Sequence, residues 1–319
     1  MDIWPLIKVL PVRTHIKFVR WARLFSSLSV LAILGSLWLT VYPFTPPCGG
    51  LACGIDFKGG TVLELSTAPK PADVGVIRGA LGGMNLGDVQ VQSAGVNAAT
   101  VRFQTPPGAD GSATVARVEG KLAQVLGQVK FTRADVVGPK VSGELLTSGL
   151  LGLGLAILAM LLYIWFRFEL QFGLGAVAAL FHDVFITFGM IAISRIEFDL
   201  RAVAAILTII GYSMNDTVVV FDRFRENLRK YKRMPLGEVI DMSINEMLTR
   251  TIITSLTAVI ALVALAFFGG PSLFGLSVIL LFGIAIGTYS SIYIAAPVIL
   301  LWGVKRAEEE PEIVTQPAR

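Results

Sequence analysis

The sequence predicts an α-helical membrane protein with about six transmembrane helices and one α+β head domain outside the bilayer. Hydrophobic residues make up 54% of the 319 residues, and the mean hydropathy is +0.70. A soluble domain of this length seldom reaches these values. One segment, 48–144, holds no apolar run long enough to span a bilayer and is rich in Gly, Asp, Gln and Thr. The chain therefore divides into a membrane part and an aqueous domain.

The first apolar run, 24–44, follows a basic segment, 1–23, which holds five Lys or Arg residues and one acid. Signal peptides share this pattern, but their apolar region is shorter and ends at a small-residue cleavage site, which we do not find here. We therefore expect an uncleaved transmembrane helix over 24–44, with residues 1–23 in the cytoplasm. Prolines at positions 43, 46 and 47 end this helix because proline removes a backbone donor.

Residues 48–144 are expected to form a ferredoxin-like α+β domain. The hydrophobic pattern predicts the order β-α-β-β-α-β, with strands over 60–66, 89–92, 99–103 and 129–137 and helices over 72–84 and 112–126. That order is typical of the split βαβ sandwich. Cys48 and Cys53 open the domain and are too few for a disulfide framework or a zinc site. They can form a local disulfide only if their loop lies outside the cytoplasm.

Five more apolar runs follow, over 145–166, 172–193, 202–221, 249–268 and 274–302. Each is near or above the length of about 20 residues that a spanning helix needs, although the run ending at 268 reaches it only if residues 249–251 are counted.

The charges between these runs indicate the orientation. Short cytoplasmic loops carry an excess of Lys and Arg. The segment 222–248 holds six Lys or Arg residues, and the tail 303–319 carries Lys305 and Arg306. An even number of helices then places both termini in the cytoplasm and the head domain on the other side. The net charge of +4 does not indicate nucleic acid, because the basic residues flank apolar runs.

Motifs of soluble enzymes are missing from the sequence, including the P-loop, G-x-S-x-G, H-E-x-x-H and paired C-x-x-C. The chain has only two histidines, His15 and His182, which excludes a histidine-rich metal site. We therefore expect no enzymatic activity, no metal and no organic cofactor.

Asp216 is the first candidate functional residue, because it lies inside the apolar run 202–221. A charge at bilayer depth costs about 2.5–3.5 kcal/mol on insertion scales, so it is rarely kept without a partner or a task. Arg250 opens the next helix, and antiparallel packing would bring it to a similar depth. An arginine favours the charged carboxylate and burial favours the neutral acid, so the pair can be poised between two states. The alternatives are a structural ion pair for Asp216 and a snorkelling interface anchor for Arg250.

His182 and Asp183 lie in the middle of the run 172–193. Adjacent helical residues point about 100° apart, so we expect one to face the Asp216 helix and the other a different neighbour. A proton relay and an interhelical hydrogen bond that fixes packing fit these two residues equally well. In the last run, Gly283 and Gly287 form a G-x-x-x-G motif that favours close helix contact.

Six short motifs occur at defined places along these elements: Gly54 to Thr61 (GIDFKGGT), Val137 to Leu145 (VGPKVSGEL), His182-Asp183, Gly211 to Thr217 (GYSMNDT) with Phe221-Asp222-Arg223, Arg250-Thr251, and Gly287 to Ser291 (GTYSS). Together they resemble the SecF family, the integral membrane subunits of bacterial SecDF translocation accessory complexes. The resemblance covers about residues 20–303.

This resemblance implies a member of the resistance-nodulation-division superfamily, whose six helices pair with six of a SecD partner. It places proton passage at Asp216 and Arg250, with Asn215, His182 and Asp183 beside them. Helix packing and motif roles fall on Gly211, Tyr212, Ser213, Thr217, Gly283 and Gly287. The head-domain motif falls on Asp56, Phe57, Gly59, Gly60 and Thr61.

The function implied is promotion of polypeptide export by the proton motive force, with protons as the coupling ion. The implied partners are a SecD-like subunit, a SecYEG-type channel, YajC/YidC-type accessory proteins, an unfolded exported polypeptide and membrane lipid, with no nucleic acid. The implied location is the bacterial inner membrane, with both termini cytoplasmic and the head periplasmic. We expect movement to reach the head through Gly138 and Pro139.

Two other functions remain open at this point. The chain is half of a proton-driven exporter of lipids or small molecules, or it is a structural scaffold in which Asp216 only packs. Exporters of this superfamily usually carry both membrane halves and two large loops in one chain, whereas this sequence has one half and one head.

Overall fold

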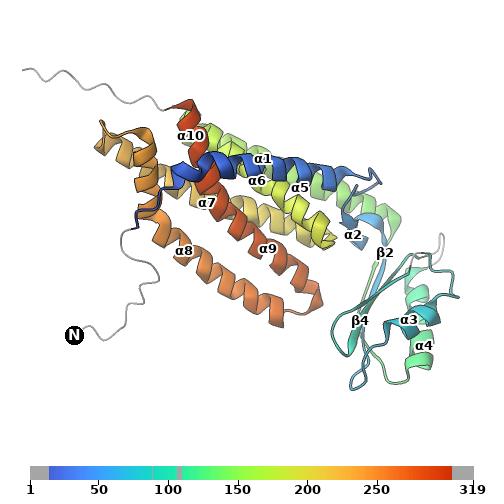
Figure 1. Cartoon of the computed structure of the whole chain (residues 1–319). Helices are drawn as coiled ribbons and strands as arrows, with labels where there is room; N and C mark the ends of the chain where they lie inside the picture. Colours follow the sequence, from blue (N-terminus) through green and yellow to red (C-terminus); the bar gives the residue numbers. More distant parts are fainter. Residues whose placement is uncertain (1–13, 88, 106–109, 304–319) are drawn as a thin grey trace, which may run out of the picture.

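The computed structural model describes residues 14–303 except 88 and 106–109. In this part of the chain, six helical segments are long and apolar enough to cross a membrane. They form one bundle, and the head domain extends from one end of it (Figure 1). The predicted fold class is confirmed.

Five of the six segments are continuous helices: α1 (Phe18–Val41), α5 (Pro139–Arg167), α6 (Leu170–Ser194), α7 (Leu200–Lys230) and α8 (Leu236–Phe268). The sixth consists of α9 (Pro271–Ser290), a π-helical turn η1 (Ser291–Ala295) and α10 (Ala296–Trp302). The central helices are α6 and α7, of which about half of the apolar span is buried, whereas α1, α5 and α8 are mostly exposed.

The expectation of a loop over 222–248 is wrong at the level of secondary structure. Helix α7 continues to Lys230 and α8 already starts at Leu236. The basic side chains of this segment are exposed or half-buried, while apolar side chains such as Phe224 and Ile240 are buried in the bundle core. Asn227 also donates to Ser243 over 2.9 Å and ties the two extensions together.

Helix α1 also begins earlier than the predicted 24, at Phe18. Its first turn is held by α8, because the backbone N–H of Val19 donates to Asp241 Oδ1 over 2.9 Å. Phe18 and Ala22 are buried. Basic side chains at positions 20 and 23 therefore do not stop the helix, since their neighbours pack against α8 and α10.

The head domain has the predicted ferredoxin-like order. Its strands are β2 (Gly60–Ser66), β3 (Gln90–Ser93), β4 (Ala98–Phe103) and β5 (Lys130–Val137), and its helices are α3 (Val74–Leu81) and α4 (Gly111–Leu126). The sheet order is β3-β4-β2-β5, with antiparallel pairing throughout. Both helices lie on the sheet face that points away from the bundle (Figure 1). Leu63, Val101 and Leu122 are fully buried in the core between them.

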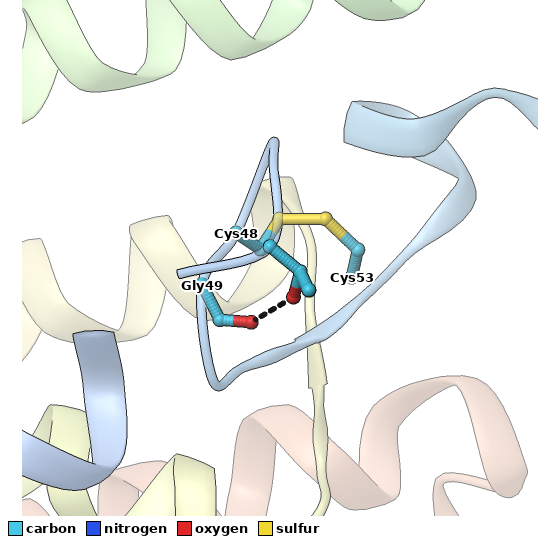
Figure 2. Close-up of a disulfide and its surroundings, with 4 residues drawn as sticks. Cys48, Gly49 and Cys53 are labelled. Carbon is cyan, nitrogen blue, oxygen red and sulfur yellow. Dashed lines mark hydrogen bonds between the residues drawn. A yellow bond between two sulfur atoms is a disulfide. The ribbon is translucent and has the colours of Figure 1, made fainter. Parts of the chain in front are cut away.

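A joint that we did not predict connects the head to the bundle. It consists of β1 (Ala52–Cys53), the short helix α2 (Ile55–Lys58) and β6 (Glu197–Phe198), which lies between α6 and α7. Strands β1 and β6 pair in parallel. Cys48 and Cys53 form a disulfide that closes the loop before α2, and a hydrogen bond to the carbonyl of Gly49 supports the loop (Figure 2).

Candidate functional site

The close approach of α7 and α9 positions the candidate site. A Cβ atom added to Gly283 would collide with the side chain of Ile209, and one added to Gly287 would lie 3.0 Å from Cβ of Ser213. Only glycine allows this contact, which is the role that the G-x-x-x-G spacing predicts. It brings the hydroxyl-rich end of α9 next to the part of α7 that carries Asp216.

Asp216 is held by two hydroxyl groups from two other helices. Thr251 of α8 donates to Oδ1 over 2.7 Å, and Ser291 at the start of η1 donates to Oδ2 over 2.9 Å. The carboxylate thus has a donor on each oxygen and lies where α7, α8 and the last helix meet. Hydroxyls both donate and accept, so the same two partners can serve the charged and the neutral acid.

Arg250 does not form an ion pair with Asp216 among the residues that the structure describes. It is exposed, and its charge acts on the carboxylate from a distance, while its neighbour Thr251 makes the direct contact. The direct partner of Asp216 is thus a neutral hydroxyl, because Thr251 faces α7 and Arg250 points outward.

His182 and Asp183 form a second polar centre on α6. Nδ1 of His182 lies 2.9 Å from Oδ1 of Asp183, and both side chains are almost fully buried. Oδ2 of Asp183 accepts hydrogen bonds from Ser213 of α7 and, over 2.8 Å, from Ser290 of α9. The His182 ring packs on Tyr289 at a centroid distance of 5.7 Å. Asp183 therefore faces the Asp216 helix and His182 faces another neighbour, as the helical geometry suggested.

Ser290 and Ser291 connect the two carboxylates. They are consecutive, and both are fully buried. Ser290 donates to Asp183 and Ser291 to Asp216. Each hydroxyl also has a backbone carbonyl of its own helix within reach, Gly287 O at 3.1 Å and Thr288 O at 3.0 Å. The π-helical turn starts here, and such turns occur frequently at functional sites.

Not all predicted residues of this region join the site. Asn215 and Gly211 lie on the exposed side of α7. Tyr212 donates to Ser255 of α8 over 3.4 Å. Thr217 is buried, and its hydroxyl has no hydrogen-bond partner within the described part of the chain. The structure thus brings together Asp183, Asp216 and Ser213, and leaves Asn215 outside.

The predicted head-domain motif lies at the joint. Asp56 Oδ2 accepts from the backbone N–H of Leu200 over 3.1 Å, at the first residue of α7. Phe57 packs against Phe198, with ring centroids 5.2 Å apart. Gly59 and Gly60 have φ angles of 75° and 126°, which glycine adopts easily, and they turn the chain from α2 into β2.

Thr61, the last residue of this motif, is fully buried, and its hydroxyl lies 3.3 Å from that of Thr105. The motif therefore fastens the head to the bundle at one end and starts its central strand at the other.

Three contact residues of the site were not among the predicted ones: Thr251, Ser290 and Ser291. They belong to the motifs that resemble the SecF family, but serine and threonine are common in apolar helices and usually bond to their own backbone. Only the packing of α8 and α9 on α7 shows that these hydroxyls reach carboxylates.

Comparisons with known proteins agree with this arrangement. A family model described as "Protein export membrane protein SecD/SecF, C-terminal" matches residues 117–305. The protein translocase subunit SecF of Cereibacter sphaeroides is 44% identical over 311 residues, which cover 94% of this chain and 93% of that protein. The SecF subunit of Rickettsia rickettsii is 37% identical over 305 residues, 95% of this chain and 96% of that protein.

Solved structures show the same fold. SecDF from Thermus thermophilus, described as a translocon-associated membrane protein, aligns with a TM-score of 0.78 and 30% identity over 92% of this chain. A SecDF structure in a super-membrane-facing form aligns with a TM-score of 0.62 and 31% identity. This chain covers 39% and 40% of those two longer chains. The relatives are translocase subunits, so the exporter alternative is not favoured. The chain belongs to the SecF family and is an accessory subunit of the Sec protein translocase.

Proposed function

We propose that this subunit uses the proton motive force to promote polypeptide export, with Asp216 as the group that takes up and releases the proton. The observation that carries the proposal is the position of Asp216: a carboxylate inside an apolar helix, whose hydrogen-bond partners in the described part of the chain are the hydroxyls of Thr251 and Ser291. No ion pair compensates its charge among the described contacts. Such an intramembrane acid is a functional candidate by default.

The charged and the neutral form of Asp216 need different hydrogen bonds from the neighbouring helices. The charged form of Asp216 accepts from Thr251 and Ser291, which draws α8 and the last helix toward α7. The neutral form needs one acceptor, and Ser291 can then turn to the carbonyl of Thr288. Moving one charge through 100 mV supplies about 2.3 kcal/mol, which is enough to bias two packings by a factor of tens.

Arg250 acts on this equilibrium through its charge rather than by direct contact. In this proposal His182 and Asp183 form an inner centre. It is connected to Asp216 through the consecutive residues Ser290 and Ser291, of which the first donates to Asp183 and the second to Asp216. Ser213 links the two centres on the other side, since it lies on α7 and donates to Asp183. Protons are the coupling ion, and no further cofactor is required.

The partners in this proposal follow from the family and from the exposed surface. The apolar sides of α1, α5 and α8 are mostly uncovered in this chain. Lipid and a SecD-like subunit would cover them, as the name of the longer SecDF relatives suggests. A SecYEG-type channel, YajC/YidC-type proteins and an unfolded exported polypeptide complete the assembly.

We place the head domain in the periplasm and both termini in the cytoplasm of a bacterial inner-membrane protein. The basic extensions of α7 and α8 support a cytoplasmic location for that end. The Cys48–Cys53 disulfide supports an oxidising compartment for the other end, where the head lies.

The test is gradient-driven export in inverted vesicles that carry this chain with its SecD partner. Asp216→Asn is expected to reduce the stimulation by a proton gradient to the level without a gradient. Asp222→Asn is the matched control, because Asp222 lies six residues further on α7 and pairs with Arg167 outside the cluster. If Asp216→Asn retains full stimulation, the proposal is wrong.

A further inference from the structure

The head domain touches the membrane helices at a second place, apart from the joint at α2. There the sheet face that the head helices leave open lies over the first turns of α7 and α9. The sheet and these turns line a cleft of about 340 Å³ and meet at its edge. Charged side chains from both sides line this cleft, among them Arg102, Arg133, Glu64 and Arg201. The contact is therefore polar, unlike the apolar packing of Phe57 at the joint.

Ser272, in the first turn of α9, is the centre of this contact. Its hydroxyl accepts a hydrogen bond from Arg133 of β5 over 2.7 Å and donates to Glu64 of β2 over 3.1 Å. Its carbonyl accepts from Arg201 Nη1 over 2.7 Å. One residue thus binds two strands of the head and the first turn of α7.

A second polar contact lies beside it. Arg102 of β4 forms an ion pair with Glu197 of β6, and both side chains are 21% exposed. The Nε atom of Arg102 is buried and has no hydrogen-bond partner among the described residues. The guanidinium is therefore only partly satisfied in this position, which limits the stabilisation that the contact gives.

This contact involves two of the helices that carry the site, α7 and α9. Helix α7 begins at Leu200 and carries Asp216 sixteen residues later, about 24 Å away at 1.5 Å per residue. The last span carries Ser291 nineteen residues after Ser272, about 28 Å away. Arg201 also bonds to Asp199, the residue that caps α7 through the N–H of Ala202. A shift of α7 against α9 at the carboxylates therefore reaches Ser272 and Arg201 directly.

We propose that Glu64, Arg133, Ser272 and Arg201 form a latch that holds the head on the first turns of α7 and α9, and that release of this latch lets the head pivot about α2. The latch would transmit relative movement of α7 and α9 to the head, in addition to the connection through Gly138 and Pro139. The origin of that movement rests on the proposed function, whereas the existence of the latch does not depend on the proposed function.

The chemistry of the contact suits a reversible latch. Hydrogen bonds at the edge of an open cleft can exchange for bonds to water, so opening leaves few groups unsatisfied. Small polar contacts between domains of one chain allow relative movement by default. The joint, with buried Phe57 and Phe198 in the bundle core, stays closed as the pivot.

The experiment measures the head position by electron-paramagnetic-resonance distances in lipid nanodiscs that contain this chain with its SecD partner. Spin labels are attached through non-canonical residues at Lys121 on α4 and Glu238 on α8, which are both exposed. Ser272→Ala is expected to increase the population of released heads about tenfold, since one hydrogen bond to a charged group is worth at least a factor of ten. Ser277→Ala is the control, because Ser277 lies on the same helix and its hydroxyl donates to the backbone carbonyl of Leu273 in that helix rather than to the head.

An unchanged distance distribution in Ser272→Ala overturns the latch, and so does an equal change in Ser277→Ala. Thermal unfolding of both variants shows whether the fold is intact, and Ser272→Thr, which keeps the hydroxyl, is expected to restore the docked distance. Adding Asp216→Asn separates the two proposals. If Ser272→Ala releases the head while Asp216→Asn leaves gradient-driven export intact, the latch stands and the proposed function fails. If Asp216→Asn abolishes the gradient-driven stimulation of export and Ser272→Ala leaves the head docked, the proposed function stands and the latch is wrong.

Discussion

Asp183 and Asp216 are both acids in apolar helices, but the structure holds them differently. Asp183 is 1% exposed and has polar partners on both oxygens, His182 on one and Ser213 with Ser290 on the other. Asp216 is less buried and has one hydroxyl on each oxygen. Asp183 is therefore fixed by its surroundings, whereas Asp216 is free to exchange partners.

This difference predicts unequal effects on stability. Asp183→Asn places an amide N–H₂ among donors and leaves at least one buried group unsatisfied, so we expect a loss of about 1–3 kcal/mol in the free energy of unfolding. Asp222→Asn removes only a surface ion pair and is expected to change it by less than about 1 kcal/mol. Unfolding in mixed detergent micelles measures both. An effect of Asp183→Asn no larger than that of Asp222→Asn would contradict this assignment.

At this scale, the sequence shows the acids but not their donors. A charge in an apolar run stands out because its burial is unfavourable, which made Asp216 and Asp183 predictable. Thr251 and Ser291 do not stand out, since a hydroxyl in a helix is satisfied by its own backbone. The charge of Arg250 predicts a pair with Asp216, but its side chain is exposed. Which residue of α8 faces Asp216 depends on the rotation of α8 about its axis, which the sequence does not specify.

At the scale of elements, the packing of α9 on α7 holds the site together. Gly283→Ala adds a Cβ that collides with Ile209, whereas Gly211→Ala on α7 meets no atom within 4 Å. The first change is expected to destabilise the protein by about 1–3 kcal/mol through overpacking. The second is expected to be neutral or to stabilise by up to about 1 kcal/mol, because alanine favours the helix. The same micelle unfolding compares the two substitutions, and equal effects would exclude helix contact as the cause.

Element boundaries were less predictable than element types. The apolar runs and the β-α-β-β-α-β order followed from periodicity, because burial imposes it on each helix and strand. The extensions of α7 and α8 beyond the apolar runs could not be predicted from periodicity. Their many charged residues resemble a loop, while a narrow apolar stripe that includes Phe224 and Ile244 packs in the core. The β1–β6 pair and the π-helical turn at Ser291 depend on contacts between distant segments and have no local pattern.

At the scale of the whole molecule, the joint and the latch divide the attachment of the head into a permanent and a reversible part. The joint is apolar, includes the β1–β6 pair and is preceded by the Cys48–Cys53 disulfide. The latch is polar and faces a cleft. Because the latch meets α7 and the last span, which carry Asp216 and the serines bonded to both carboxylates, its equilibrium is the expected output of the site.

That equilibrium is expected to depend on pH through Glu197. Burial raises the pKa of Glu197 above its ordinary value; Arg102 opposes this shift, Asp199 adds to it and Arg201 opposes it. Release of the head opens the cleft around Glu197 to water, so the docked head binds a proton at Glu197 more readily than the released head does. Docking is then strengthened as the pH falls toward the ordinary value and weakened as it rises through the raised pKa. Glu197→Gln, which is neutral at every pH, is expected to remove this dependence.

The measurement is the spin-label distance between Lys121 and Glu238 from about pH 4, near the ordinary value for a carboxyl group, to about pH 8. The wild-type chain is expected to shift from docked toward released heads as the pH rises, and Glu197→Gln to keep the same distribution throughout. Glu119→Gln, on α4 away from the cleft, is the control and is expected to behave as wild type. A pH dependence that persists unchanged in Glu197→Gln would assign it to another group. A dependence of opposite sign would show that the attraction of Arg102 for the charged carboxylate outweighs the burial of Glu197.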